Sequence, residues 1–339
     1  MSLAQLIQDA WNKQAKWLVV LRPLSWLYHL GFVVNKSLYR LGLKQRYTAP
    51  VPVMVIGNIT VGGSGKTPLL IELVKYLQSE QVRVAVISRG YGGEGPFPAL
   101  VTADSEPTQV GDEPCLIVQA TRVPMAVGSN RQHSIDLLLK NSAEPIDLII
   151  SDDGLQHWSL NRQLEWIVLD QNRGLGNARL LPEGYLREPK SRLQQSTVIE
   201  HAAHPQTDLS MHLQATEPYL LNAHSDQTDA WFNPDLDYYA VVGIGFPQRF
   251  YGTLESMGVR HFQCHEFADH YDYEMADLEF EDANPIITTE KDAVKLLALL
   301  KQNPNFKREI WVVPVDAVLS DACYSLFNRQ LKQLGIQLG

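Results

Sequence analysis

A glycine-rich segment at residues 60–67, TVGGSGKT, contains the residues whose types and spacing point most clearly to chemistry. Glycine lets several backbone amides converge on phosphate oxygens, because it has no side chain to stand in the way. Lys66 would reach the β- and γ-phosphates of a nucleotide, and the hydroxyl of Thr67 would bind Mg²⁺. The predicted nucleotide-binding residues are Thr60, Val61, Gly62, Gly63, Ser64, Gly65, Lys66 and Thr67.

The segment departs at one position from the usual phosphate-loop pattern, G-x-x-x-x-G-K-[ST], since Thr60 stands where that pattern has its first glycine. The surroundings compensate, because the apolar run at 51–57 predicts a strand before the loop and 66–79 predicts a helix after it. The positive N-terminal end of that helix would face the phosphates. This order of elements favours nucleotide binding over a chance glycine turn.

Two adjacent carboxylates follow another apolar run, at 146–151. Asp152 and Asp153 lie at the end of this predicted strand, where a Walker-B carboxylate holds the magnesium ion of a P-loop enzyme. Neighbouring carboxylates repel each other unless a cation or hydrogen bonds compensate. The alternative is a plain Asp-Asp-Gly turn, since both residue types favour turns.

Further polar residues lie near other predicted strand ends. Asp112 and Glu113, in the segment VGDEP, stand at an expected helix start, where they could act in catalysis or simply cap the helix. Arg89, in the segment SRGYGG, and Arg131 could bind phosphates or could be ordinary surface arginines.

Two other segments look like known motifs but fail on spacing. The two histidines of HEFADH (265–270) are five residues apart, so they would project from different sides of a helix and would not form a zinc site. In TEKD (289–292) the lysine and aspartate are adjacent, unlike the Asn-Lys-x-Asp motif that reads guanine. A GTPase switch is therefore not supported.

Apolar runs rich in β-branched residues recur along the chain and alternate with stretches compatible with helices. Near-continuous apolar runs are typical of strands buried in a parallel sheet. The expected strands of the first unit lie at 51–57, 82–88, 123–128, 146–151 and 164–170, with helices at 66–79 and 130–141. This alternation predicts an α/β fold with a doubly wound, mostly parallel sheet of the P-loop NTPase type.

The pattern loosens between 171 and 235 and then resumes as a second, smaller α/β domain. Its expected strands lie at 238–245, 261–265, 284–289 and 309–315, and its helices at 248–257 and 290–301. The predicted organisation is an N-terminal helical segment at 1–48, a P-loop core at 49–215 and the smaller domain at 216–339. The boundary between the last two could fall anywhere from 175 to 235.

The first 48 residues differ from the rest of the chain in charge, with seven lysines and arginines, the single acid Asp9, and three of the seven tryptophans. If 24–43 is helical, one face is apolar and the opposite face is basic. The apolar face holds Leu27, Leu30, Val34, Leu38 and Leu41, and the basic face His29, Lys36 and Arg40. Such an amphipathic helix suits the surface of an anionic membrane, whereas Arg22, Pro23 and His29 argue against a true span. The alternative is a helix docked on its own domain with the lysines outward.

The overall composition excludes some partners and compartments. A net charge of −9 over 339 residues argues against a nucleic-acid-binding protein, which needs clustered Lys and Arg. The three cysteines, Cys115, Cys264 and Cys323, are far apart and follow no metal-ligand spacing. We therefore expect a protein of the reducing cytoplasm, without a secretory signal.

Eight segments, taken in order between residues 50 and 295, resemble the tetraacyldisaccharide 4′-kinases of lipid A biosynthesis. The segments are GNITVGGSGKTP, SRGYGG, VGDEP, SDDGLQH, GNARLLPEGYLREP, GIGFPQRF, FADHYDY and TTEKDAVKL. That family characteristically lacks the first Walker glycine, which accounts for Thr60. The resemblance implies transfer of the γ-phosphoryl group of ATP, with Mg²⁺, to the 4′-hydroxyl of an acylated glucosamine disaccharide 1-phosphate. It also implies peripheral or monotopic attachment through the N-terminal helix to the cytoplasmic face of the inner membrane.

The resemblance further implies roles for individual residues. Asp112 would be the catalytic base, paired with His270, and Lys66 would complete the catalytic set; the alternative for His270 is an ordinary histidine in a surface loop. Arg187 would bind phosphate and Glu188 magnesium, although Tyr185 departs from the proline of that motif. The expected metal ligands are Thr67, Asp152, Asp153 and Glu188, and the expected substrate-binding arginines are Arg89, Arg131 and Arg187.

A second function, a membrane-associated P-loop ATPase that acts as a switch without a lipid acceptor, would use the same phosphate loop, acids and N-terminal helix. The second α/β unit separates the two hypotheses, because a compact switch does not require its FADHYDY and TTEKDAVKL segments.

Overall fold

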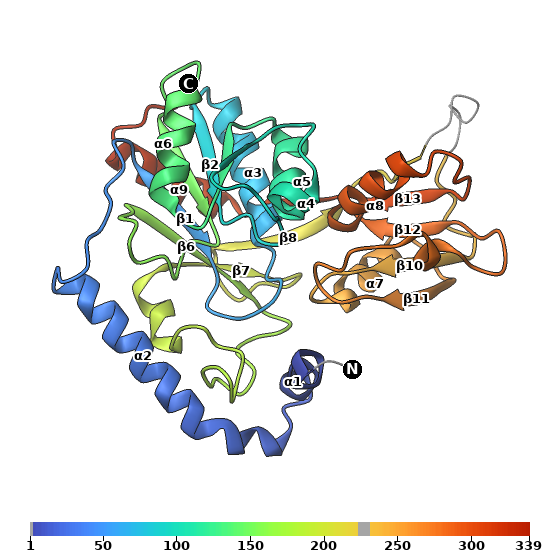
Figure 1. The fold of residues 1–339 in the computed structure, drawn as a ribbon, viewed down its shortest axis with the longest axis horizontal. Coiled ribbons are helices and arrows are strands. Elements are labelled where there is room, and N and C mark those ends of the chain that lie inside the picture. Colours follow the sequence, from blue (N-terminus) through green and yellow to red (C-terminus); the bar gives the residue numbers. More distant parts are fainter. Residues whose placement is uncertain (1–2, 223–230) are drawn as a thin grey trace.

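The computed structural model describes residues 3–222 and 231–339, which contain two β-sheets (Figure 1). The larger sheet has nine strands in the order β14-β8-β7-β6-β1-β5-β2-β4-β3. The strands are β1 (Val53–Gly57), β2 (Val84–Ser88), β3 (Ala99–Val101), β4 (Met125–Val127), β5 (Leu148–Asp152), β6 (Leu164–Asp170), β7 (Thr197–His201), β8 (Ser210–Ala215) and β14 (Val315–Leu319). Only the edge strands β3 and β14 pair antiparallel among these nine described strands. The predicted doubly wound, mostly parallel sheet is confirmed.

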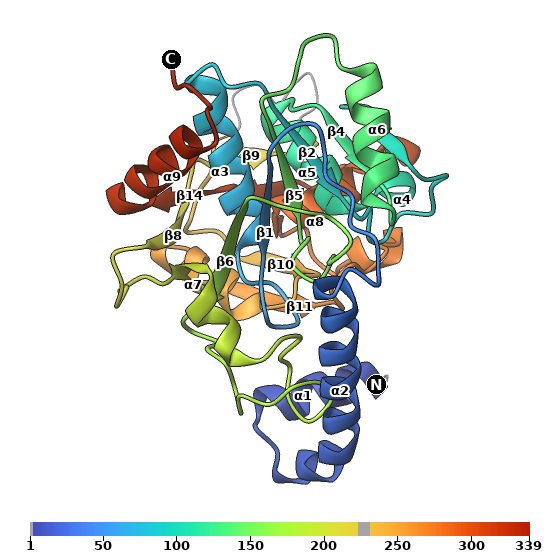
Figure 2. The same ribbon diagram turned by 90° about the vertical axis from the view of Figure 1, so that its left-hand side faces the viewer.

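Helices cover both faces of the larger sheet (Figure 2). On one face α3 (Lys66–Ser79), α5 (Asp112–Thr121) and α9 (Asp321–Gln333) share a cluster of buried side chains with Met54 and Ile56 of β1. On the other face α6 (Arg131–Asn141) packs with Val53 of the same strand. Because successive strand residues point to opposite faces, the uninterrupted apolar run of β1 serves both cores.

The smaller sheet has five strands in the order β11-β10-β12-β13-β9. They are β9 (Tyr219–Leu220), β10 (Tyr238–Val242), β11 (Phe262–Glu266), β12 (Ile286–Thr289) and β13 (Ile310–Val313). The helix α7 (Pro247–Ser256) packs on one face through Phe250 and Leu254, and α8 (Glu290–Gln302) packs on the other through Leu296 and Leu300. A second, smaller α/β unit is therefore present, beside α4 (Pro107–Val110) and α5 of the larger one (Figure 1).

The last residues of the chain return to the larger sheet. The strand β14 pairs antiparallel with β8 over five residue pairs, from Val315 with Ala215 to Leu319 with Met211. The ring of Phe327 in α9 then packs at 5.2 Å from that of Trp166 in β6. The assignment of the whole of 216–339 to the smaller domain is therefore wrong for 315–339. The last element predicted from periodicity was the strand at 309–315, so neither β14 nor α9 was expected, and local periodicity carries no signal for the sheet that a strand joins.

The N-terminal segment forms α1 (Leu3–Asn12), the 3₁₀-helix η1 (Lys16–Leu21) and the long helix α2 (Arg22–Arg40), which extends along one side of the molecule (Figures 1 and 2). The stretch Lys16–Arg40 is long and apolar enough to cross a membrane: an 18-residue window within it has a mean hydropathy of 1.4, and 11% of that window is buried. Its predicted apolar face points away from the protein, since Leu27 is 66% and Leu30 is 59% exposed.

The opposite side of α2 contacts the rest of the chain. Ser25 donates to the carbonyl of Leu180 at 3.0 Å, and Arg22 pairs with Glu183 at 2.7 Å. Nearer the end of the helix, the Lys36 ammonium lies 4.9 Å from the ring centroid of Trp158. The alternative in which the apolar face docks on the protein and the lysines face solvent is therefore wrong, because polar and basic side chains make the contact.

Candidate active site

The phosphate loop connects the end of β1 at Gly57 to the start of α3 at Lys66. Gly62 and Gly65 have φ values of +96° and +94°, in the left-handed region that favours glycine. A Cβ on Gly65 would also lie 2.7 Å from Nδ1 of His201, so the loop packs closely there. At Gly63, in contrast, a Cβ would meet no described atom within 4 Å, which leaves that part of the loop open to a ligand.

Thr60 supports the loop instead of bending it. Its backbone forms an antiparallel bridge with Leu186, and its φ angle lies outside the left-handed region. Its hydroxyl accepts a hydrogen bond from Asn58 at 3.3 Å, and Asn58 also donates to the carbonyl of Gly62 at 3.1 Å. A residue with this extended backbone does not need to be glycine, which explains the departure from the usual pattern.

The two predicted Walker-B acids lie beside the loop. Asp152 ends β5 opposite Ile56 of the parallel strand β1, and Asp153 follows it with a left-handed φ of +44°. The Asp153 carboxylate is 3.8 Å from the ammonium of Lys66. Ser88 donates to one oxygen of Asp152 at 3.1 Å, whereas the other oxygen, Oδ1, is buried without a hydrogen-bond partner in the described part of the chain.

The two acids differ in their electrostatics. Burial, followed by the nearby charges of Glu113 and Asp153, raises the pKa of Asp152 to about 7. Burial also raises the pKa of Asp153, but the positive charges of Lys66 and Arg187 outweigh it and hold that pKa well below its usual range. An unpartnered buried carboxylate oxygen of raised pKa fits the approach of a hard cation.

Magnesium usually binds through one or two carboxylates together with phosphate oxygens and water, and not through an all-protein cage. Residues 3–222 and 231–339 hold no group of three or more His, Cys, Asp or Glu side chains suited to a metal. The residues that fit the ion are Asp152 and Asp153, with Thr67 in the first turn of α3.

Arg187 and Glu188 lie next to this site but make different contacts. Both terminal nitrogens of Arg187 donate to the Asp153 carboxylate at 3.0 Å, and its Nε donates to the carbonyl of Thr60 at 3.1 Å. The fully buried Glu188 accepts from Gln156 at 2.8 Å and lies 3.3 Å from Nε of Arg192. The structure thus brings Arg187 to the Walker-B acid and gives Glu188 partners outside the predicted magnesium set.

The other two candidate arginines differ in burial. Arg131, only 3% exposed, donates to the carbonyl of Gly128 at 2.8 Å and to that of Asp152 at 3.3 Å. Burial lowers its pKa to about 10; the carboxylates of Asp152 and Asp153 oppose this shift, and the charge of Arg89 contributes to it. Arg89 itself is exposed. Arg131 therefore supports the end of β5 at the candidate metal ligand Asp152, while Arg89 remains accessible to a substrate.

Asp112 and His270, which are 158 positions apart in the sequence, meet between the two α/β units. Nδ1 of His270 lies 3.0 Å from each carboxylate oxygen of Asp112. Asp112 is the first residue of α5 and is 4% exposed, and His270 follows β11 with a left-handed φ of +61°. The ring of Tyr91 lies 4.9 Å from the imidazole. The alternative of an ordinary histidine in a surface loop does not account for this contact with a buried carboxylate.

Each member of this pair favours the charged form of the other. Burial lowers the pKa of His270, but the hydrogen bond with Asp112 raises it, and the net shift is upward. Burial raises the pKa of Asp112, but the hydrogen bond with His270 and the charge of Lys291 bring the net shift below its usual range. The pair is therefore held as a carboxylate beside an imidazolium.

Residues of the smaller unit also reach the phosphate loop. A Cβ on Gly245, in the GIGFPQRF segment, would lie 3.2 Å from the amide nitrogen of Gly63. Arg249 of α7 forms an ion pair with Asp170 at the end of β6. These contacts were not predicted, although the sequence segment that contains Gly245 and Arg249 was recognised as a motif.

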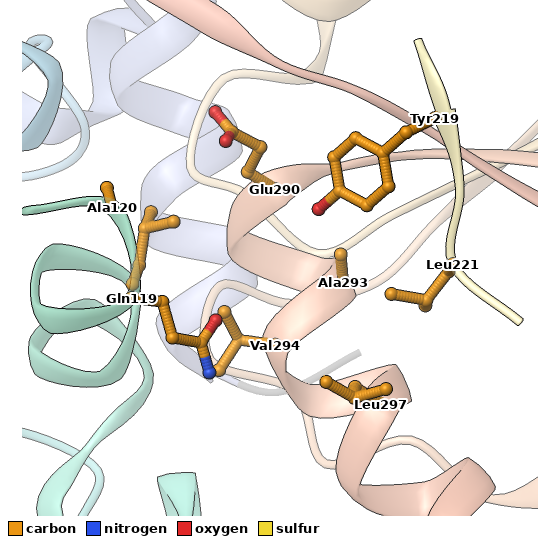
Figure 3. A pocket seen from close by; sticks show the side chains of 9 residues that line it. Gln119, Ala120, Tyr219, Leu221, Glu290, Ala293, Val294 and Leu297 are labelled. Carbon is orange, nitrogen blue, oxygen red and sulfur yellow. The ribbon is translucent and has the colours of Figure 1, made fainter. Parts of the chain in front are cut away.

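A cavity of about 170 Å³ lies between α5, α8 and β9 (Figure 3). Its lining is mostly apolar, with Gln119, Tyr219 and Glu290 as polar exceptions. None of the lining residues belongs to the phosphate loop or to the Asp112–His270 pair. The candidate active site is therefore distinct from this cavity.

Comparison with known proteins gives one consistent result. A family model described as Tetraacyldisaccharide-1-P 4′-kinase, LpxK, matches residues 17–332. The chain is similar to a protein from Psychrobacter cryohalolentis named Tetraacyldisaccharide 4′-kinase, with 46% identity over 100% of this chain and 99% of the relative. A protein of the same name from Pasteurella multocida is 44% identical over 89% of this chain and 90% of the relative. The crystal structure of LpxK from Aquifex aeolicus in complex with ATP superposes with a TM-score of 0.73 and 26% identity, covering 94% of this chain and 99% of that one.

Proposed function

Since the chain belongs to the tetraacyldisaccharide 4′-kinase family, we propose that Asp112, His270 and Lys66 carry out its phosphoryl transfer. The reaction is that of the family: the γ-phosphoryl group of ATP passes to the 4′-hydroxyl of a tetraacyldisaccharide 1-phosphate, a lipid A precursor. Among the hypotheses from the sequence, the kinase is therefore preferred to an ATPase switch without a lipid acceptor.

The phosphate loop binds the triphosphate of ATP. Gly62, Gly63 and Gly65 expose backbone amides, and the N-terminal end of α3 adds its positive dipole. The side chain of Lys66 is 13% exposed and lies beside Asp153. From this position its ammonium reaches the β- and γ-phosphates. The open space at Gly63 supports this position for the terminal phosphates.

Thr67, Asp152 and Asp153 hold the magnesium ion, which when bound neutralises charge on the transferred group. Arg187 fixes the orientation of Asp153 through two parallel hydrogen bonds. Glu188 supports the site only indirectly, because it binds Gln156, and Gln156 also donates to the carbonyl of Asn58 at 3.3 Å. A direct bond from Glu188 to magnesium has no support from these contacts.

In the transfer, the 4′-oxygen forms a bond to the γ-phosphorus while the bond from that phosphorus to the bridging β–γ oxygen breaks, and ADP leaves. The hydroxyl proton passes to the Asp112 carboxylate. His270 orients the carboxylate and stabilises its charge before the proton arrives. Lys66 stabilises the negative charge that develops on the phosphoryl oxygens.

The observation that carries this assignment is the 3.0 Å contact between Asp112 and His270 at the junction of the two units. The test is an assay of labelled γ-phosphate transfer from ATP to tetraacyldisaccharide 1-phosphate, with each of the three residues substituted in turn. Label released only as free phosphate by the unaltered enzyme would contradict a kinase activity.

The lipid substrate implies an enzyme that works at a membrane. The attachment is through the N-terminal segment, residues 3–43, which exposes many large apolar side chains. Among the described residues these exposed side chains include Leu6, Trp17, Val19, Val20, Leu24, Trp26, Leu27, Leu30, Val33, Val34, Leu41 and Leu43. Because the opposite side of α2 holds on to the protein through Arg22 and Ser25, the helix lies along the surface of the bilayer instead of crossing it.

The membrane face is the cytoplasmic face of the inner membrane. The free thiols of Cys115, Cys264 and Cys323 and the requirement for ATP both support a reducing compartment. Arg89, exposed at the end of β2, is available there for an anionic group of the substrate.

A further inference from the structure

The segment TTEKDAVKL has no role in the assignments above. It spans the end of β12 and the first turns of α8, where Thr289 caps the helix by accepting from the amide of Asp292. Two charged residues, Lys291 and Asp292, therefore stand side by side in the first turn. Adjacent residues on a helix point in different directions, so the two side chains serve different surroundings.

Asp292 is satisfied inside the smaller unit. Its fully buried carboxylate accepts from the hydroxyl of Tyr273 at 2.9 Å and from the amide of Gly243 at 3.1 Å, and Lys295 lies 3.4 Å away. These contacts tie the start of α8 to β10 and to the segment after His270. Asp292 is thus a structural residue that fixes where α8 begins.

Lys291 points across to the larger unit. Its ammonium lies 3.1 Å from Oε1 of Glu113 in α5 and 3.0 Å from Oδ1 of Asp269, which precedes His270. The same nitrogen is 3.9 Å from Oδ2 of Asp112. One side chain therefore contacts both the helix that carries Asp112 and the segment that carries His270.

We propose that Lys291 is a positioning residue for the phosphoryl transfer. It joins α5 of the larger unit to the 267–273 segment of the smaller one and so holds Asp112 and His270 in contact. This inference rests on the proposed role of Asp112 as the base. Lys291 does not touch the substrate; it acts through the Asp112–His270 pair.

The charge distribution supports this role. A lysine in the first turn of α8 is disfavoured by the helix dipole, which prefers anions at an N-terminus. The carboxylates of Asp112, Glu113 and Asp269 compensate for this unfavourable interaction with the dipole. The lysine in turn reduces the repulsion among the three carboxylates. The charged and titratable groups around Asp112 are Glu113 and Cys115 of α5, Asp269 and His270 of the 267–273 segment, and Lys291 and Lys295 of α8.

A second contact between the units lies away from the Asp112–His270 pair, so the effect of Lys291 on that pair is specific. Arg249 pairs with Asp170 beside the phosphate loop and also connects the two units. That ion pair involves neither Asp112 nor His270. Loss of Lys291 therefore leaves one connection between the units in place but disturbs the pair that receives the proton.

The test compares Lys291→Met with Lys291→Arg, and uses Lys301→Met, an exposed position on the same helix, as the matched control. Steady-state transfer from ATP to tetraacyldisaccharide 1-phosphate gives kcat and KM, and the pH profile of kcat is recorded for each variant. For Lys291→Met we expect kcat to fall about 100-fold, the loss that a misplacement of about 1 Å produces, with a much smaller change in KM for ATP. The acidic limb of the profile should move to higher pH, since removal of a nearby cation disfavours the Asp112 carboxylate. Lys291→Arg should recover part of the rate, and Lys301→Met should behave as the unaltered enzyme.

The inference is overturned if Lys291→Met keeps its kcat while Asp112→Asn loses it, or if the rate falls without any shift of the pH profile. If Asp112→Asn itself keeps its rate, the proposed base is wrong and the failure lies in the proposed function. Should Lys291→Met not fold, Asp269→Asn removes one of the two closest partners and leaves α8 intact. It should shift the profile, and an unchanged profile and kcat in that variant would equally overturn the inference.

Discussion

The guanidinium of Arg187 donates two hydrogen bonds of 3.0 Å to the carboxylate of Asp153, which itself lies 3.8 Å from the ammonium of Lys66. Arg187 thus connects the Walker-B acid to the phosphate loop, since it also donates to the carbonyl of Thr60. The backbone of Arg187 in turn accepts from the hydroxyl of Tyr28 in α2 at 2.9 Å. The helix that we assign to the membrane is therefore two contacts away from the proposed magnesium ligand Asp153.

Replacement of Arg187 by glutamine should weaken magnesium-dependent ATP turnover. Residues that orient metal ligands typically contribute about 10- to 100-fold in activity, and we expect a fall in kcat/KM for ATP in that range. A titration of kcat against magnesium concentration measures the effect. Arg83→Gln, which breaks an exposed ion pair with Asp147, is the control and should leave the titration unchanged. An unaltered magnesium dependence in Arg187→Gln would contradict the assignment.

Two glycine substitutions in the phosphate loop should have different effects. Gly65→Ala places a side chain at a φ of +94° and against His201, so it should lower the free energy of unfolding by about 1–3 kcal/mol. Gly63→Ala meets no described atom within 4 Å, so it should leave Tm nearly unchanged and raise KM for ATP, because its methyl group occupies the phosphate space. Thermal unfolding and ATP kinetics separate the two. Equal Tm losses in both variants would be inconsistent with the open space at Gly63.

The Asp112–His270 contact predicts a dependence of stability on pH. The pKa of His270 is raised in the folded protein, so the stability from its imidazolium is fully present below the unfolded pKa of about 6.5 and is lost as pH rises through the folded pKa. The difference in Tm between the unaltered enzyme and His270→Gln should therefore be larger at pH 6 than at pH 9. A difference that grows toward pH 9 would show that the pair is not a carboxylate beside an imidazolium.

The exposed apolar face of α2 predicts membrane binding that depends on it. Deletion of residues 1–45, or replacement of Leu27, Leu30 and Val34 by serine, should release the protein from vesicles that contain anionic lipid. Sedimentation with such vesicles gives the bound fraction. Replacement of Leu100 by serine, an exposed apolar residue of β3, is the control and should leave binding intact. Sedimentation of the truncated protein at the level of the full chain would refute this attachment.

Much of the fold followed from local patterns. The helix predicted at 66–79 is α3 with the same bounds, and Asp152 ends β5 as expected, because buried parallel strands and their helices leave a strong signal in the sequence. The return of β14 to the larger sheet left no such signal, since pairing partners far apart in the chain do not alter local periodicity.

Within the site, the contacts that local sequence patterns could not predict all depend on tertiary structure. The Asp112–His270 pair was expected only from the family resemblance, and the bridge from Lys291 to Glu113 and Asp269 was not expected at all. The TTEKDAVKL segment was recognised as a motif, but the residues that contact Lys291 come from two other elements of the chain. The helix was predicted to be amphipathic, with interfacial membrane contact as the first interpretation, whereas the protein contacts of its opposite side could only be read from the structure.

The central claim is that Asp112 accepts the proton of the 4′-hydroxyl, and its most direct test is the transfer of labelled γ-phosphate to tetraacyldisaccharide 1-phosphate by Asp112→Asn at saturating ATP. Asp316→Asn, half exposed on β14, is the matched control. General base catalysis contributes about 10²- to 10⁴-fold, so we predict a fall of kcat in that range with ATP affinity nearly unchanged. A kcat equal to that of the unaltered enzyme, or a loss of ATP affinity as large as the loss of rate, would contradict the account.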